Sequence, residues 1–134
     1  MRKQICCVLA MALTLVFAGC AGSKSNNHKS VEELADFLVD RGVPVTAVQA
    51  VHPAVFKAMR GFAFEIDNDL EIGVYQYDLN NNRMRETVER YKESNFAYVE
   101  GIKYQAWVEG SFLILGLEKN PYRAQIEAAL KEFY

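Results

Sequence analysis

The stretch GFAFEIDNDLEIGVYQYD, residues 61–78, decides the fold of this chain. Apolar side chains stand at every second position from 62 to 66 and again from 70 to 74. Alternation with a period of two is typical of strands that bury one face. The intervening Asp67-Asn68-Asp69 has the composition of a tight turn. The stretch therefore predicts two antiparallel strands joined as a β-hairpin.

On the C-terminal side, the sequence predicts a helix and then a second hairpin with its own helix. Met84, Val88 and Tyr91 have helical spacing within residues 80–94. Strands are expected at 103–108 and 111–117, joined at Glu109-Gly110, before a helix over 121–133. The strand 111–117 is apolar on both faces, so it is either covered on both sides or presents a patch to a partner. A hairpin followed by a helix is thus predicted twice.

On the N-terminal side, Ser30 and Glu33 form a capping box at the start of a helix expected over 30–41. A strand rich in β-branched residues is expected at 43–51, and a short helical turn within 53–60. Helices interspersed with antiparallel hairpins predict an α+β fold. We expect a two-layer sandwich, in which one mostly antiparallel sheet has its helices packed on one face.

The first twenty residues have the pattern of a secretory signal peptide. Arg2 and Lys3 precede an apolar run over residues 5–17. A helix of that length spans about 20 Å, which is short of the ~30 Å hydrocarbon core that a membrane-spanning anchor would have to cross. The alternative, a transmembrane helix, is therefore disfavoured.

The end of this segment, Phe17-Ala18-Gly19-Cys20, resembles the lipobox of bacterial lipoproteins. The resemblance implies cleavage before Cys20 and attachment of acyl chains such as palmitate to Cys20. It also implies a location on the extracytoplasmic side of a bacterial membrane, the outer membrane if the cell has two. Since Cys6 and Cys7 would leave with the signal, no free thiol would remain for a disulfide, a metal site or catalysis. The mature part resembles small secreted lipoproteins of no known function.

The expected organisation is a signal peptide over 1–19, a lipidated cysteine and flexible linker over 20–29, and one globular domain over 30–134. The linker prediction rests on small and polar residues without a hydrophobic period. Loss of residues 1–19 leaves 13 basic and 17 acidic residues, a net charge of −4. The acidic charge of this domain argues against binding to nucleic acid and against binding to anionic lipids through a cluster of basic residues.

The sequence offers little catalytic or metal-binding chemistry. His52 precedes Pro53 at a strand end, where a capping or surface role is expected, and Ser111 lacks the surroundings of a nucleophile. The run after Asp78 resembles a calcium loop of the EF-hand type, but Arg83 stands where the turn needs glycine. A capped helix start explains this run better, so we expect neither a metal nor another cofactor.

The remaining candidates for function are aromatic. Strand alternation places Tyr75 and Tyr77 opposite the apolar side chains at 70, 72 and 74, and we expect Trp107 to share their face. If the helices cover the other face, these three rings form an exposed binding surface. The hypothesis is a non-catalytic module that binds an envelope protein or another envelope component. The alternative is a small envelope hydrolase or metal-dependent enzyme that uses His52 and nearby carboxylates.

Overall fold

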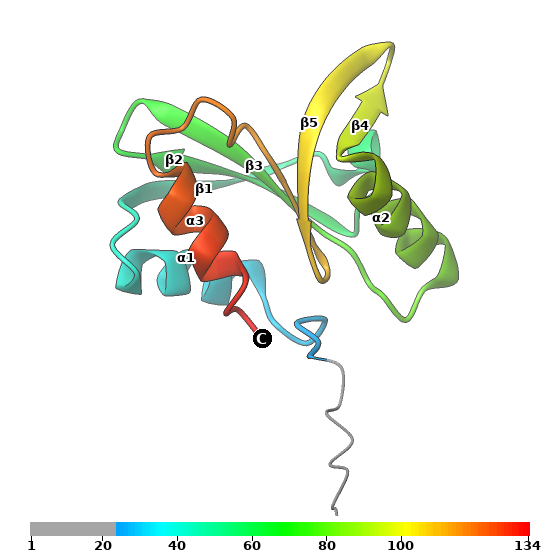
Figure 1. Ribbon diagram of the computed structural model, residues 1–134, viewed down its shortest axis with the longest axis horizontal. Helices are drawn as coiled ribbons and strands as arrows, with labels where there is room; N and C mark the ends of the chain where they lie inside the picture. Colours follow the sequence, from blue (N-terminus) through cyan, green and yellow to red (C-terminus); the bar gives the residue numbers. More distant parts are fainter. Residues whose placement is uncertain (1–23) are drawn as a thin grey trace, which may run out of the picture.

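The computed structural model describes residues 24–134, so the predicted signal peptide and Cys20 lie outside the described residues. The elements in chain order are α1 (Val31–Asp40), β1 (Val45–Val51), the 3₁₀ helix η1 (Pro53–Phe56), β2 (Arg60–Ile66), β3 (Leu70–Gln76), α2 (Asn82–Ser94), β4 (Phe96–Val99), β5 (Ile102–Glu109), β6 (Phe112–Leu115) and α3 (Arg123–Leu130). Figure 1 shows their arrangement around one sheet.

The sheet has six strands in the order β1-β2-β3-β6-β5-β4, and every neighbouring pair is antiparallel. The hairpin predicted from residues 61–78 is β2–β3, in which Phe64 lies opposite Ile72. Residues 67–69 form the turn between the paired Ile66 and Leu70, and Asp67 and Asn68 there have positive φ angles, which Asn and Asp tolerate well. The predicted α+β fold with an antiparallel sheet is confirmed.

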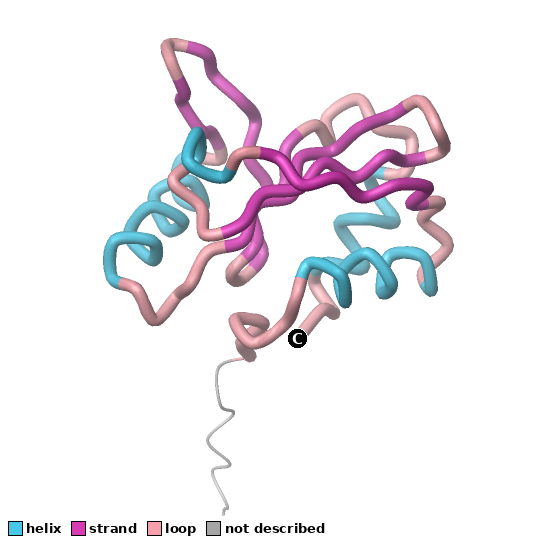
Figure 2. Tube along the Cα trace, turned by 180° about the vertical axis from the view of Figure 1, so that it is seen from behind, coloured by secondary structure: helices cyan, strands magenta, loops and turns pink. Residues whose placement is uncertain are grey.

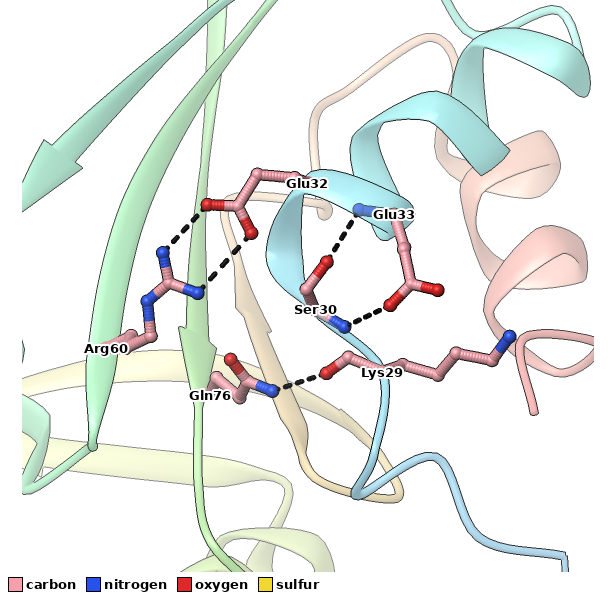
Figure 3. Close-up of polar contacts among 6 residues, drawn as sticks. All are labelled: Lys29, Ser30, Glu32, Glu33, Arg60 and Gln76. Carbon is pink, nitrogen blue, oxygen red and sulfur yellow. Dashed lines mark hydrogen bonds and ion pairs between the residues drawn. The ribbon is translucent and has the colours of Figure 1, made fainter.

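Helix α1 begins with the predicted capping box. The Glu33 amide donates to Ser30 Oγ at 3.0 Å, and the Ser30 amide donates to Glu33 Oε2 at 2.7 Å (Figure 3). In the same turn, Arg60 of β2 donates to Glu32 at 2.8 Å and joins the helix to the sheet. The sequence therefore determines where this helix starts, and one ion pair helps to seat it.

One face of the sheet carries an aliphatic core, closed by α1 and α3. Figure 2 shows both helices on the same side of the strands. The aliphatic core consists of buried residues from both helices and from the facing strand positions, chiefly Leu34, Leu38, Phe64, Ile66, Ile72, Val74, Phe112, Ile114, Ile126, Leu130 and Phe133. These side chains carry no polar atoms, so their own contribution to stability comes from apolar burial.

The opposite face carries an aromatic core, closed by α2 and η1. Its buried residues are Phe56, Ala58, Tyr75, Tyr77, Val88, Tyr91, Ala97, Ala106, Leu113 and Leu115. Helix α2 is therefore not on the face of α1 and α3, where the sequence analysis placed all the helices. A helical period shows that a helix has a buried side, but it does not show which face of a sheet that side meets.

Strand β4 was not predicted, because its four residues are too few to show a clear alternation. It pairs with β5 through a two-residue turn, in which Glu100 and Gly101 have positive φ angles. The predicted order of hairpin and then helix is observed twice, as β2–β3–α2 and β5–β6–α3. Strand β6 is buried at all four positions, so the strand that is apolar on both faces is central and covered on both sides.

Candidate functional site

The three aromatic residues predicted to form a binding surface do not do so. Tyr77 is fully buried, and its hydroxyl donates to the Phe56 carbonyl at 2.7 Å. The Tyr75 ring lies against the backbone of Gly61 and Gly73, where an added Cβ would approach the ring to 3.0 Å at either position. Both tyrosines lie on the predicted face of β3, but α2 and η1 cover that face. The expectation of exposed rings was therefore wrong.

Trp107 lies on the other face of the sheet, which corrects a second expectation. It stands opposite Ile114, and Ile114 stands opposite Val74, so all three share the face of the aliphatic core. The ring is partly buried against that core, and its Nε1 is buried without a hydrogen-bond partner within the described residues. Alternation orders the residues within one strand, whereas the face depends on the register with the neighbouring strand.

The residues considered for catalysis or metal binding have local structural roles. His52 is exposed at the start of η1, where its Nδ1 accepts the Ala54 amide at 3.3 Å. Asp78 accepts the Asn80 amide at 2.9 Å just before α2, which is capped by Asn81. Across residues 24–134, no group of three or more His, Cys, Asp or Glu side chains could hold a metal ion.

The last part of the predicted linker is not free but docked on the domain. Asn26 is only 1% exposed, and its side-chain oxygen accepts the Ser111 amide at 2.8 Å and the Ser111 hydroxyl at 3.1 Å. Its amide nitrogen donates to the Glu109 carbonyl at 3.2 Å. The buried Ser111 is thus a partner of Asn26. The boundary of the ordered domain moves from residue 30 to residue 26 or before.

Residues 26–29, called here the docked segment, make further contacts. The Asn27 side chain accepts the Leu79 amide at 2.8 Å, and Gln76 donates to the Lys29 carbonyl at 2.6 Å (Figure 3). At Gly110 an added Cβ would fall 2.1 Å from Asn26 Oδ1, and the φ angle is +58°, so glycine is required there. A run of polar residues is typical of a linker. Here the hydrogen bonds of Asn26 attach this run to the β5–β6 turn.

The strongest candidate site is a groove between α2, η1 and β4. One hollow of about 340 Å³ and a second of about 230 Å³ share Lys57. We call the two together the basic groove. Its lining residues are Val55, Lys57, Asn81, Arg83, Met84, Thr87, Arg90, Tyr91, Ser94, Phe96 and Tyr98.

The basic groove is built from elements that the sequence specifies separately. Arg83, Thr87, Arg90 and Ser94 follow one another at helical spacing and form one stripe along α2. Across from them, Lys57 caps the end of η1 with a left-handed φ angle of 55°. A non-glycine residue in that conformation destabilises the fold by on the order of 1 kcal/mol. Here the residue in that conformation places a positive charge in the groove.

The lining of the basic groove is cationic. It contains three basic side chains and no carboxylate, in a protein whose net charge is −2. Helix α2 also carries three acidic residues, Glu86, Glu89 and Glu93, but none of them lines either hollow. Within residues 24–134, the side-chain ion pairs use other arginines, namely Arg41, Arg60 and Arg123. In the described part of the chain, Lys57, Arg83 and Arg90 therefore take part in no ion pair.

The rest of the lining is aromatic and aliphatic. Tyr98 is 62% exposed and Val55 is 50% exposed, which is high for side chains of this size. Tyr91 is buried beneath them, and burial raises the pKa of its hydroxyl while the nearby Arg90 acts in the opposite direction. A site of this kind can bind an anionic group next to an apolar one.

The chain matches no protein-family model, no curated protein sequence and no solved structure. None of the helices described in residues 24–134 combines the length and the apolar character needed to cross a membrane. Interpretation of the site therefore rests on its geometry. The sequence analysis missed the groove, although the arginine stripe of α2 was a usable signal, because nothing in the sequence places Lys57 and β4 beside that helix.

Proposed function

We propose that this protein is a non-catalytic binding module, anchored by a lipid on Cys20 to the extracytoplasmic side of a bacterial membrane. The observation that supports this most is the position of the docked segment relative to the basic groove. The docked segment lies beside the C-terminus and the β5–β6 turn, and the tip of the β4–β5 hairpin lies at the opposite end (Figures 1 and 2). The larger hollow of the groove opens beside β4, on the side of the hairpin, whereas the smaller hollow lies at the start of α2, close to Leu79 and its bond to the docked segment.

The docked segment restricts how the domain can move on its proposed anchor. Six residue steps separate Cys20 from the buried Asn26, which is a reach of at most about 20 Å for an extended chain. A lipidated Cys20 would therefore keep the β5–β6 turn near the membrane. The β4–β5 hairpin would then project away from the lipid, where a partner could reach the groove.

The anchor is tested by Cys20→Ser in cells grown with a radiolabelled or clickable palmitate. Serine cannot form the thioether that lipidation requires, so acyl labelling should disappear and the precursor should remain uncut. A Cys20→Ser protein that is still processed and still labelled would contradict the anchor.

The binding role is tested by site-specific photocrosslinking in intact cells. A photoreactive amino acid at Tyr98, in the groove, should give a discrete crosslinked product that Arg90→Glu abolishes. The matched control is the same probe at Val48, which is 41% exposed on β1 at the other edge of the sheet. Equal products from both positions, or a product from Tyr98 that is unchanged in Arg90→Glu, would contradict a binding role for the groove.

A further inference from the structure

We infer that the basic groove binds an acidic peptide segment that carries an apolar side chain, supplied by a protein partner. This inference rests on the proposed binding function and adds the chemistry of the ligand. Three features of the groove support it: its charge, its apolar floor and the outward-facing backbone amide and carbonyl of Tyr98 in β4.

The charge of the groove selects an anionic ligand. Lys57 and Arg90 line the larger hollow, and Lys57 and Arg83 line the smaller one. At physiological ionic strength the Debye length is about 8 Å, so a ligand inside the hollows responds mainly to the lining cations, since Glu86 and Glu93 of α2 line neither hollow. An anionic ligand is therefore attracted and a cationic one is repelled.

The apolar part of the larger hollow favours a ligand that has an apolar side chain as well as negative charge. Val55, Phe96 and Tyr98 come from η1 and β4 and are placed beside Arg90 of α2. Exposed aromatic side chains next to arginine are the composition typical of the energetic centre of a protein interface. An apolar side chain of the ligand would cover them, with its acidic groups on Lys57 and Arg90.

The backbone of β4 favours a peptide over an anionic polysaccharide. Strand β4 is the last strand of the sheet, and Val99 and Ile102 face each other across its two-residue turn. Hydrogen-bonded and non-bonded pairs alternate in an antiparallel ladder, so the amide and carbonyl of Tyr98 point away from β5. A peptide can pair with both groups, as in recognition by strand addition. An anionic lipid headgroup is disfavoured at the larger hollow, because this hollow lies beside β4, away from the docked segment.

The test is a selection of binding peptides on the lipidated protein, which is held in nanodiscs made of zwitterionic lipid. Phage-displayed random decapeptides are selected on the protein, and the enriched sequences are compared with the unselected library. We expect enrichment of peptides with several Asp or Glu residues and at least one large apolar residue. The affinity of the best synthetic peptide should fall as salt is raised, because charge contributes to its binding.

Two variants connect this binding to the groove. Lys57→Gly removes a charge and also relieves the left-handed backbone, so it should keep the fold intact. Combined with Arg90→Gln, it should weaken binding of the selected peptide about tenfold or more. The matched control is Lys92→Gln, a charge change on α2 outside both hollows of the groove, which should leave the affinity unchanged.

The remaining outcomes are decisive as well. Enrichment of neutral or basic peptides, or binding that is equal in the double variant, would overturn the inference. So would tight binding of polygalacturonate or of vesicles rich in anionic lipid, without binding of acidic peptides. If the Tyr98 crosslink forms and is lost in Arg90→Glu while acidic peptides fail to bind, the proposed function stands and only the ligand class is wrong.

Discussion

The two faces of the sheet differ in their side chains and in how completely they are covered. The aliphatic face is closed by two helices, α1 and α3, and its core side chains have no polar atoms. The aromatic face is closed by one long helix, α2, and by the single turn of η1. On that face the Phe56 ring lies tilted against the Tyr75 ring, with centroids 4.5 Å apart, and meets the Tyr104 ring edge-on with centroids 5.5 Å apart.

The difference shows which face is available for recognition. An aliphatic core gains stability by burial alone, and exposing any of it is costly. Aromatic side chains with hydroxyl groups tolerate partial exposure, and they gain specificity from their hydrogen bonds. The incomplete cover of the aromatic face therefore leaves the basic groove at its rim.

The largest effect is expected for removal of a buried ring from the aromatic face. Tyr77→Ala should lower the free energy of unfolding by about 3–5 kcal/mol, comparable with Phe64→Ala on the aliphatic face. Tyr77→Phe should still cost about 1–3 kcal/mol, because it leaves the buried Phe56 carbonyl unpaired. Chemical denaturation measures all three. A Tyr77→Phe protein as stable as the parent would show that the hydroxyl is not part of what distinguishes the two faces.

Trp107 tests whether its face is structural. We expect Trp107→Ala to cost about 3 kcal/mol, the low end for a large aromatic residue, because the ring is partly buried against the aliphatic core. Trp107→Phe should cost less than about 1 kcal/mol, since it deletes a buried donor that has no partner in residues 24–134. A loss below about 0.5 kcal/mol in Trp107→Ala would instead be typical of a surface residue.

The docked segment allows a third test, which compares buried and exposed positions in the stretch predicted to be linker. Asn26→Ala leaves the Ser111 amide and hydroxyl without their partner, and should cost about 1–3 kcal/mol. The control is Lys24→Ala, an exposed position that should change stability by less than about 0.5 kcal/mol. If both variants lost equally little stability, residues 26–29 would behave as a linker, as the sequence predicted.

The smallest effect is expected from alkaline pH. Burial, together with a hydrogen bond to Glu109, raises the pKa of Tyr134 from 10.0 to about 12, and burial also raises the pKa of Tyr75, Tyr77 and Tyr91. A folded-state pKa above the unfolded value favours the neutral hydroxyl in the native protein. Its contribution is complete below pH 10 and is lost as the pH rises toward 12.

Denaturation series at pH 8, 10 and 11 measure this effect, with Tyr134→Phe as the comparison. The parent should lose more stability than the variant over this range, because one raised pKa has been removed. The tyrosines of the aromatic face should still cause a decrease in the variant. Identical pH profiles would show that Tyr134 is titrated alike in the folded and unfolded chains.

The sequence by itself determined most of the elements, with β4 the exception, because their signals are local. Alternation and the Asp67-Asn68 turn fix the β2–β3 hairpin, and the Ser30 capping box fixes the start of α1. Both depend on residues a few positions apart, so a pattern in the chain is sufficient to reveal them. The α+β class follows from the sum of these elements.

Only the tertiary structure decided which residues are available for function. Tyr77 is part of the core because α2 packs on its face of the sheet. Trp107 lies on the face opposite to the predicted one because the face depends on register with the neighbouring strand. Asn26 became buried through bonds to a turn 85 residues away in the chain. Lys57 and Arg90 line one groove although no local pattern links them. Contacts between distant segments depend on packing and register, which are properties of the whole chain.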